Sequence, residues 1–306
     1  MEASTLSISD IVSFEEIKYE TTYDIEVEEN HNFYLATQSM PILVHNSGKS
    51  EFTDYVMSEL AKNHKWSFGV CSFENQPSSL HVTKLMEKVV GKSFAKRFND
   101  SDRISKPEFE TAVSFIEEHF YFVNINQVKV TVDGILEKTK ELILRKGIKG
   151  LLIDPWNYIE HKSEKGQTET QYISECLTKI KAFCLTHNVH IFLIAHPSKM
   201  PKVAGKYEVP TLYNVSGSAH FFNKADNGIC VHRDFGSTKV DIYIQKVRYS
   251  WLGKVGFTSF NYNIDRRQYM PIGGAVEQQA QIIPENPRAG ITDLRLPYND
   301  KEDAPF

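Results

Sequence analysis

After residue 50, apolar stretches of strand length alternate with amphipathic stretches of helix length, and this alternation constrains the fold most strongly. The expected strands are 66–73, 120–124, 150–154 and 190–195, and the expected helices are 51–63, 79–90, 106–119, 132–145 and 169–187. Strands that alternate with helices predict a mostly parallel sheet with helices on both faces. Later segments at 228–232, 240–247 and 254–262 alternate polar and apolar residues, which predicts antiparallel strands. The fold class expected is therefore α/β.

The first 46 residues follow a different pattern. Polar and β-branched residues alternate at 8–12, 23–27, 33–35 and 42–44, with turn residues between them. This period of two predicts several short strands and a small all-β unit. At the other end, residues 272–306 mix Pro, Gly, Asn and Asp with little periodicity, which predicts a flexible tail. We therefore divide the chain into 1–46, 47–271 and 272–306.

Composition excludes some classes of protein. The 306 residues are 41% hydrophobic, which suffices for a sizeable core, and the formal net charge of −4 excludes a globally basic nucleic-acid binder. Four cysteines lie far apart without a CxxC pair, so we expect reduced thiols and a cytoplasmic protein. No apolar run is long enough to span a bilayer, so no membrane partner is expected.

The sharpest local signal lies where the two patterns meet, in the sequence Val-His-Asn-Ser-Gly-Lys-Ser at 44–50. Gly48-Lys49-Ser50 at the start of a helix is similar to the second half of a phosphate loop, in which Lys meets the outer phosphates and Ser binds Mg²⁺. A complete loop needs a Gly five residues before Gly48, but position 43 is Leu. An ordinary helix start capped by Ser47 or Ser50 is the alternative.

The residues before Gly48 explain the absent half of the loop. His45-Asn46 followed by Ser47 resembles the carboxyl-terminal splice junction of an intein, and residues 23–33 resemble the upstream motif of the same family. An isolated His-Asn-Ser would indicate an ordinary turn, so the interpretation depends on the two motifs together. The resemblance implies that 1–46 are a carboxyl-terminal intein (Hint) fragment.

The intein resemblance gives these residues chemical roles. The side chain of Asn46 would cyclise onto its own carbonyl and break the bond to the nucleophile Ser47. His45 would polarise that carbonyl, and His31, tuned by Asp24, would transfer protons.

Splicing would remove residues 1–46 and join an upstream fragment to Ser47, which would complete a phosphate loop. The amino-terminal half of the intein is not present in the sequence, so we expect it on another chain, as in a split intein that acts in trans. A truncated copy of a longer contiguous gene is the alternative. By this interpretation the ATPase lacks its first strand and the first half of its phosphate loop.

Three polar residues follow expected strands of the α/β segment. Asp154 ends the buried strand 150–154, where a carboxylate could hold Mg²⁺ through water, and Glu74 follows 66–73, where it could activate a water that attacks the γ-phosphate. His196 follows 190–195, where a polar side chain could sense that phosphate. A turn Asp, an exposed Glu and a structural His are the alternatives.

A basic pair comes later in the chain. Lys246 and Arg248 end the expected strand 240–247 with one residue between them, so alternation points them the same way. Such a pair could reach the nucleotide of a neighbouring subunit and stabilise transition-state charge. Two exposed basic residues on a strand are the alternative.

In this order the motifs resemble the RecA-like hexameric replicative helicases of the DnaB and Twinkle group, over about residues 47–270. Residues 154–157 (Asp-Pro-Trp-Asn) and 209–213 (Val-Pro-Thr-Leu-Tyr) are most similar to Twinkle-like phage primase–helicases, and a His at 196 favours the same branch. The resemblance implies a RecA-like P-loop core that uses ATP and Mg²⁺ and assembles as a ring hexamer. It also implies translocation on single-stranded DNA and unwinding of duplex DNA.

The resemblance places the DNA contact in the loop after His196, which carries Lys199, Lys202 and Lys206. A few cations per subunit suffice for backbone contacts, which reconciles DNA binding with the negative net charge. A solvated surface loop is the alternative. Two other interpretations of the whole chain stay open: a RecA-type recombinase or clock-type ATPase, and an inactive binding remnant. The Lys-x-Arg pair after the Asn-Lys-Ala-Asp segment at 223–226 favours the helicase.

Overall fold

The computed structural model describes most of the α/β segment and two short pieces before it. The described residues are 32–35, 42–45, 48–94, 103–123, 130–160, 167–198, 202–203, 206–215, 219–233, 237–264 and 266–272. For 32–35, 42–45, 202–203 and 206–207 only the course of the backbone is described.

A parallel sheet of four strands forms the centre, in the order β4–β3–β5–β6. Its strands are β3 (Phe68–Ser72), β4 (Phe120–Phe122), β5 (Gly150–Asp154) and β6 (His190–Leu193). Side chains alternate across it as a period of two requires, so Leu151 and Ile153 enter the core on one face and Leu152 enters the core on the other. β3 and β5 are buried throughout, as expected for parallel strands that are covered on both faces.

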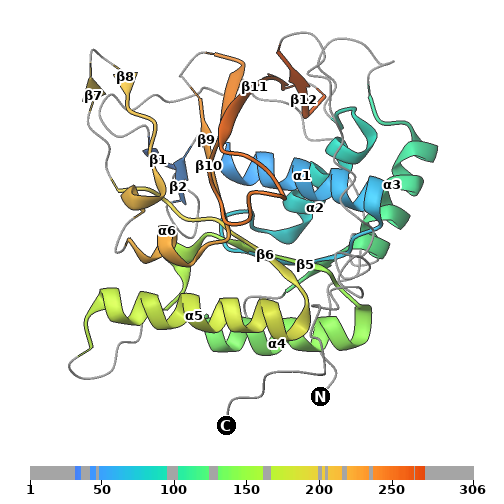
Figure 1. Cartoon of the computed structure of the whole chain (residues 1–306). Coiled ribbons are helices and arrows are strands. Elements are labelled where there is room, and N and C mark those ends of the chain that lie inside the picture. Colours follow the sequence, from blue (N-terminus) through green and yellow to red (C-terminus); the bar gives the residue numbers. More distant parts are fainter. Residues whose placement is uncertain are drawn as a thin grey trace, which may run out of the picture.

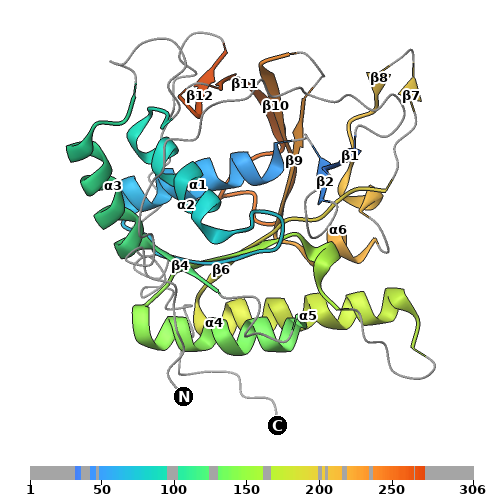
Figure 2. The same cartoon turned by 180° about the vertical axis from the view of Figure 1, so that it is seen from behind.

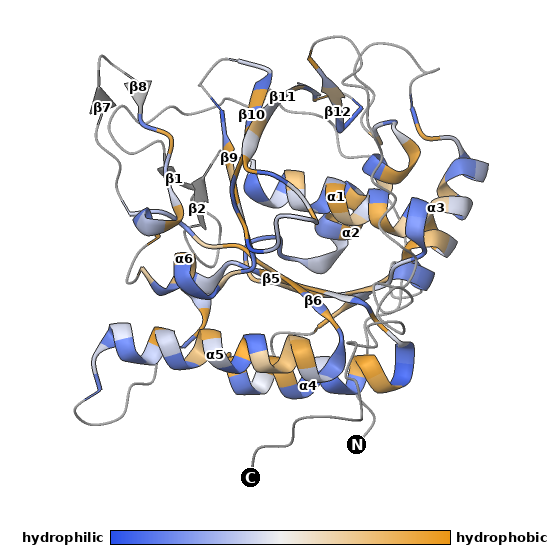
Figure 3. Ribbon diagram, in the orientation of Figure 1, coloured by the Kyte–Doolittle hydropathy of each residue, from blue (hydrophilic) through white to orange (hydrophobic). Residues whose placement is uncertain are grey.

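Helices cover both faces of this sheet (Figures 1 and 2). α1 (Lys49–His64), α2 (Ser78–Val90) and α3 (Lys106–His119) lie on one face, and α4 (Val132–Lys146) and α5 (Glu169–His187) lie on the other. Figure 3 shows apolar residues concentrated in the strands and on the helix surfaces next to them. The predicted parallel sheet with two helical layers is confirmed.

A second, antiparallel sheet packs against α1. Its order is β12–β11–β10–β9, with β9 (Asn227–His232), β10 (Lys239–Val247), β11 (Gly256–Asn263) and β12 (Gln268–Pro271). The rings of Tyr262 and Tyr269 form a small core with Phe52 and Tyr55 of α1. β9 to β11 match the predicted antiparallel strands, whereas β12 and the short helix α6 (His220–Lys224) were not predicted.

Two hairpins complete the described structure. β1 (Asn32–Leu35) pairs with β2 (Ile42–His45), as predicted for the strands at 33–35 and 42–44, and β7 (Lys202–Val203) pairs with β8 (Lys206–Tyr207). The strands predicted at 8–12 and 23–27 lie outside the described residues, as does the predicted tail beyond residue 272. Among the described helices, none is both long and apolar enough to cross a membrane.

A buried charge network fixes the first turn of α1 to its neighbours. Lys88 of α2, which is completely buried, donates to Oε1 of Glu51 at 2.6 Å, and the hydroxyl of Tyr262 donates to the same oxygen at 2.5 Å. Burial raises the pKa of Glu51, but Lys88 and Tyr262 outweigh it and bring the pKa down to about 2. The network therefore holds the start of α1 between α2 and β11.

Candidate functional site

The start of α1 has the backbone of a loop that bends sharply into a helix. Gly48 is the N-cap residue, with a φ of +79° in the left-handed region that favours glycine. The N-cap position is taken by Gly48, so the alternative of a helix start capped by Ser50 is wrong, and Ser47 lies outside the described residues. The N-terminus of this 16-residue helix carries the partial positive charge of the helix dipole, which favours an anion.

Three neighbouring strands bring their polar ends to the same edge of the sheet as α1. Glu74 follows β3, Asp154 ends β5 and His196 follows β6. Because β3, β5 and β6 are adjacent and parallel, these side chains converge. His196 Nε2 lies 3.2 Å from Glu74 Oε1, and the His196 backbone N–H donates to Asn157 Oδ1 at 3.0 Å.

Asp154 is the most deeply buried member of this group. It is 0% exposed, and burial, reinforced by the charge of Glu74, raises the pKa of its carboxyl to about 6 although the Ser50 side chain lowers it. The approach of Ser50 is not a well-formed hydrogen bond, and neither carboxylate oxygen of Asp154 has such a partner among the described residues. A buried carboxylate with two unsatisfied oxygens is suited to a cation or to water bound to one.

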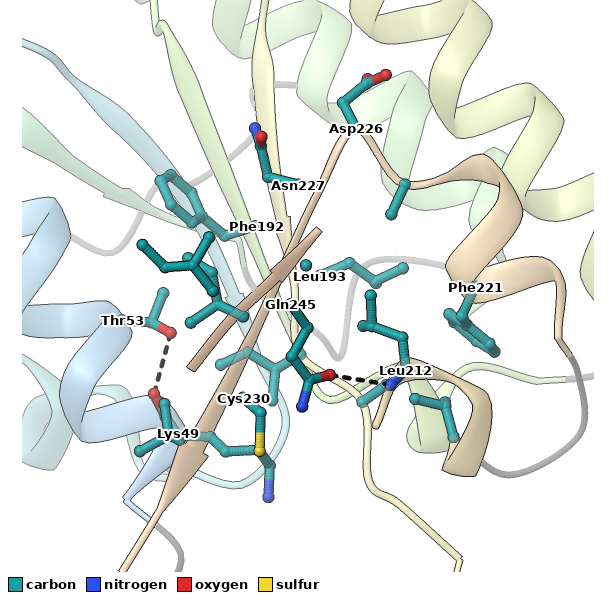
Figure 4. A pocket seen from close by; sticks show the side chains of 18 of the residues that line it. Lys49, Thr53, Phe192, Leu193, Leu212, Phe221, Asp226, Asn227, Cys230 and Gln245 are labelled. Carbon is teal, nitrogen blue, oxygen red and sulfur yellow. Dashed lines mark hydrogen bonds between the residues drawn. The ribbon is translucent and has the colours of Figure 1, made fainter. Parts of the chain in front are cut away.

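Lys49 faces the same group from the first residue of α1. Burial lowers the pKa of its ammonium, while Glu74 and Asp154 raise it. Figure 4 shows its side chain extending toward Cys230 of β9 along the wall of a cavity. The structure therefore brings Lys49, Ser50, Glu74, Asp154 and His196 together, whereas the sequence analysis considered each of them at its own strand or helix end.

The oxygen donors at this edge of the sheet suit Mg²⁺ better than a metal ion whose ligands all come from the protein. The Ser50 hydroxyl and the Asp154 carboxylate are hard oxygen donors. Within the described residues, no cluster of three or more His, Cys, Asp or Glu side chains could hold a metal ion. Mg²⁺ usually takes one or two protein ligands and completes its shell with water and substrate phosphates.

A buried polar pair behind the site was not predicted. Asp54 Oδ1 lies 2.9 Å from His81 Nε2, both residues are at most 1% exposed, and their charges act on the pKa of Asp154. Asp54 lies one helical turn after Ser50, on the same face of α1. A charged residue at a core position of the apolar stripe is the signal that could have identified it.

Lys246 and Arg248 point the same way, as predicted, but they contact their own chain. Lys246 donates to the backbone oxygens of Phe222 and Asn223, and Arg248 donates to Asn223 O at 3.1 Å and pairs with Asp226 at 2.7 Å. Both residues thus lie against the end of α6, and about a third of the Arg248 side chain is exposed.

Several predicted site residues lie outside the described part of the chain or are described by their backbone alone. His31, Asn46, Ser47 and Lys199 lie outside the described residues. For three others only the backbone is described: His45 ends β2, Lys202 begins β7 and Lys206 begins β8.

Comparison with known proteins identifies one related sequence and several related folds. No protein-family model matches the chain. A protein described as "Twinkle homolog protein, chloroplastic/mitochondrial" from Arabidopsis thaliana is 39% identical over 219 residues, which cover 69% of this chain and 30% of that protein. Among solved structures, one isolated ATPase domain has a TM-score of 0.61 at 17% identity, and the match covers 74% of this chain and 82% of that domain.

A DnaB-like replicative helicase, solved in a study of its interactions with primase, has a TM-score of 0.60 at 17% identity. The match covers 74% of this chain and 57% of that one. These likenesses, together with the parallel sheet, show a RecA-like ATPase fold. The chain thus has the fold of DnaB-like ATPase domains and is similar in sequence to a Twinkle homologue, of which it spans about 30%.

Proposed function

We propose that this chain is part of a replicative DNA helicase that hydrolyses ATP, moves along single-stranded DNA and unwinds duplex DNA. The observation that carries the proposal is the convergence of Lys49, Ser50, Glu74, Asp154 and His196 at one sheet edge. The likeness to a Twinkle homologue and to DnaB-like ATPase domains supports it.

Each of these side chains has a role that its position allows. The ammonium of Lys49 and the N-terminus of α1 bind the phosphates of ATP. Ser50 and Asp154 hold Mg²⁺, which when bound neutralises phosphate charge. Glu74 takes a proton from the attacking water, and His196, 3.2 Å from Glu74, connects that base to the end of β6.

Substituting Lys49 tests the proposed activity. In the spliced product, we expect Lys49→Ala to reduce ATP turnover stimulated by single-stranded DNA by at least about 100-fold, the scale of loss when one electrostatic contact to the reacting group is removed. Strand separation of a forked duplex should be abolished. The reason is the loss of a positive charge that faces the site from the first residue of α1. Lys140→Ala on the outer face of α4 is the matched control and should retain full turnover. Turnover above one tenth of normal in Lys49→Ala would contradict the proposal.

The remaining parts of the helicase proposal concern assembly and DNA. We propose a ring hexamer in which Lys246 and Arg248 leave the end of α6 and reach the nucleotide of the neighbouring subunit. The loop that contains β7 and β8 contacts the DNA backbone through Lys199, Lys202 and Lys206. A RecA-type recombinase would instead promote strand pairing without processive unwinding, and an inactive remnant would do neither.

We further propose that residues 1–46 are the carboxyl-terminal part of an intein that works with an amino-terminal intein part. β1 and β2 support this, because Asn32 pairs with His45 and so joins the end of the upstream motif to the splice junction. His45 and His31 assist while Asn46 cyclises and breaks its bond to Ser47. The hydroxyl of Ser47 has by then accepted the upstream polypeptide as an ester, which rearranges to an amide.

Asn46→Ala tests this chemistry. Mixed with its amino-terminal partner, the variant should release no residues 1–46, because alanine has no amide nitrogen to attack its own carbonyl. Mass spectrometry of the mixture would detect the ligated product and the excised fragment. Asn63→Ala, an exposed substitution on α1, should splice normally. Unchanged release from Asn46→Ala would refute the role of Asn46.

A further inference from the structure

The structure contains a large cavity beside the candidate site. It has a volume of about 1350 Å³, above the range of roughly 300–1,000 Å³ that small-molecule pockets usually have. Apolar side chains of several elements line it, among them Val56 of α1, Leu177 of α5, Ile191 and Leu193 of β6, and Ile229 and Val231 of β9. Figure 4 shows β6 and β9 residues on its walls, with Lys49 at one end.

Two of its walls are edges of β-sheets. Among the described strands, β6 pairs with β5 alone and β9 pairs with β10 alone, so each has one side without a strand partner. The burial of β6 agrees with this: its residues are half-buried or exposed, whereas those of β3 and β5 are all buried. Ile229 of β9 is 52% exposed although it lines the cavity. A strand edge between apolar side chains is the kind of surface that recognises an extended apolar peptide.

The course of the chain into α1 indicates which peptide fits. In a parallel sheet, the strand that leads into α1 should lie beside a neighbouring strand and end where Gly48 and Lys49 begin the helix. The described strand before α1 is β2, which pairs with β1 and not with β6 or β9. Splicing at Asn46–Ser47 would replace β2 by the upstream polypeptide as the segment that enters α1.

We propose that this cavity is a strand acceptor that binds the upstream polypeptide non-covalently before splicing. The inference rests on the proposed splicing, which defines this polypeptide as the one that becomes joined to Ser47. It contributes one extended apolar segment that runs parallel to β6, contacts β9 on its other side and ends at Gly48. Docking raises the effective concentration of the two splice junctions and afterwards leaves the strand in place as part of the ATPase.

A peptide-binding experiment tests this on the full chain. The protein carries Asn46→Ala so that splicing cannot follow, and the probe is a fluorescein-labelled 15-residue peptide. Its sequence copies the segment of the Arabidopsis thaliana Twinkle homologue that directly precedes the counterpart of α1. We expect saturable binding of this peptide by fluorescence anisotropy and no binding of a scrambled peptide. Bound peptide should also slow amide hydrogen exchange at least tenfold in both 190–195 and 227–232.

Two variants locate the binding. Ile229→Asp places a charge on the cavity wall and should weaken peptide binding at least tenfold, and its exposure makes the substitution compatible with folding. Phe257→Asp is the control, because Phe257 is 68% exposed on β11 and does not line the cavity, so binding should change less than twofold.

Three results would overturn the strand acceptor. They are equal binding of the scrambled peptide, unchanged peptide binding by Ile229→Asp, and slower amide exchange in β6 without slower exchange in β9. The measurement requires neither splicing nor ATP turnover. Failed docking together with an active spliced product would therefore contradict this inference alone. Docking to a chain that neither splices nor yields an active ATPase would contradict the proposed function, and with it the role of the acceptor in splicing, but not the binding of a strand in the cavity.

Discussion

Glu74→Gln should reduce ATP turnover of the spliced product by about 100- to 10,000-fold, the range expected when a positioned general base is removed. Glutamine keeps the shape of the side chain but cannot take a proton from water. Because Lys49, Ser50 and Asp154 are unchanged, binding of a fluorescent ATP analogue should change by less than about threefold. The measurements are steady-state hydrolysis with single-stranded DNA present and a titration with the analogue.

A matched glutamate serves as the control for this experiment. Glu118 of α3 has a side chain that is 74% exposed and lies outside the candidate site, so Glu118→Gln should retain normal turnover. Turnover above one tenth of normal in Glu74→Gln would show that another group is the base. Loss of nucleotide binding together with turnover would instead show that Glu74 acts in binding.

Lys88→Met should lower the free energy of unfolding by about 3–5 kcal/mol, the usual cost of removing one partner from a buried ion pair. Methionine fills the space of the lysine stem but leaves the Glu51 carboxylate without the ammonium that donates to it. The hydroxyl of Tyr262 would still donate to that carboxylate. Urea unfolding monitored by circular dichroism at pH 7 measures the change.

An exposed pair provides the comparison. Lys106 and Glu110 on α3 lie 4.0 Å apart with side chains that are mostly exposed, so Lys106→Met should change stability by less than about 1 kcal/mol. If Lys88→Met were as mild as Lys106→Met, the buried network would not stabilise the start of α1. The double variant Lys88→Met/Glu51→Gln should recover part of the loss, because it leaves no unpaired charge.

The buried pair of Lys88 and Glu51 also predicts how the stability of the fold depends on pH. The pKa of Glu51 is about 2 in the folded protein, below its ordinary value of 4.5. A lowered carboxyl pKa stabilises the fold at every pH above the ordinary value, and this stabilisation is lost as pH falls from about 4.5 toward 2. Lys88→Met should lose much of this acid dependence, which urea unfolding at a series of pH values would measure.

Helix boundaries could be predicted where local chemistry fixes them. α3 begins after a capping box made by Ser105 and Glu108, α5 begins after one made by Thr168 and Gln171, and both helices have the predicted bounds. A capping box satisfies backbone donors within four residues, so its signal is local. β12 and α6 have no comparable signal, because four or five residues are too few for a periodic pattern. Pairing with β11 decides β12, and packing decides α6.

The polar residues at the strand ends were each predicted from the sequence, and the structure shows the side chains and burial around them. The raised pKa of Asp154 depends on burial by segments distant in sequence. The pair of Asp54 and His81 joins residues 27 positions apart on two helices, so a local pattern could single out Asp54 but not its partner. The contacts of Lys246 and Arg248 with the end of α6 likewise depend on how β10 packs.

By itself the sequence determined the α/β class, the helices, the strand ends that carry polar residues and the change of pattern near residue 47, because periodicity and capping act over a few residues. Only the tertiary structure decided that Lys49, Ser50, Glu74, Asp154 and His196 share one edge, since that needs adjacent parallel strands. It also decided that β6 and β9 face one cavity. Strand pairing and burial join residues that lie far apart in the chain, and no local pattern encodes such contacts.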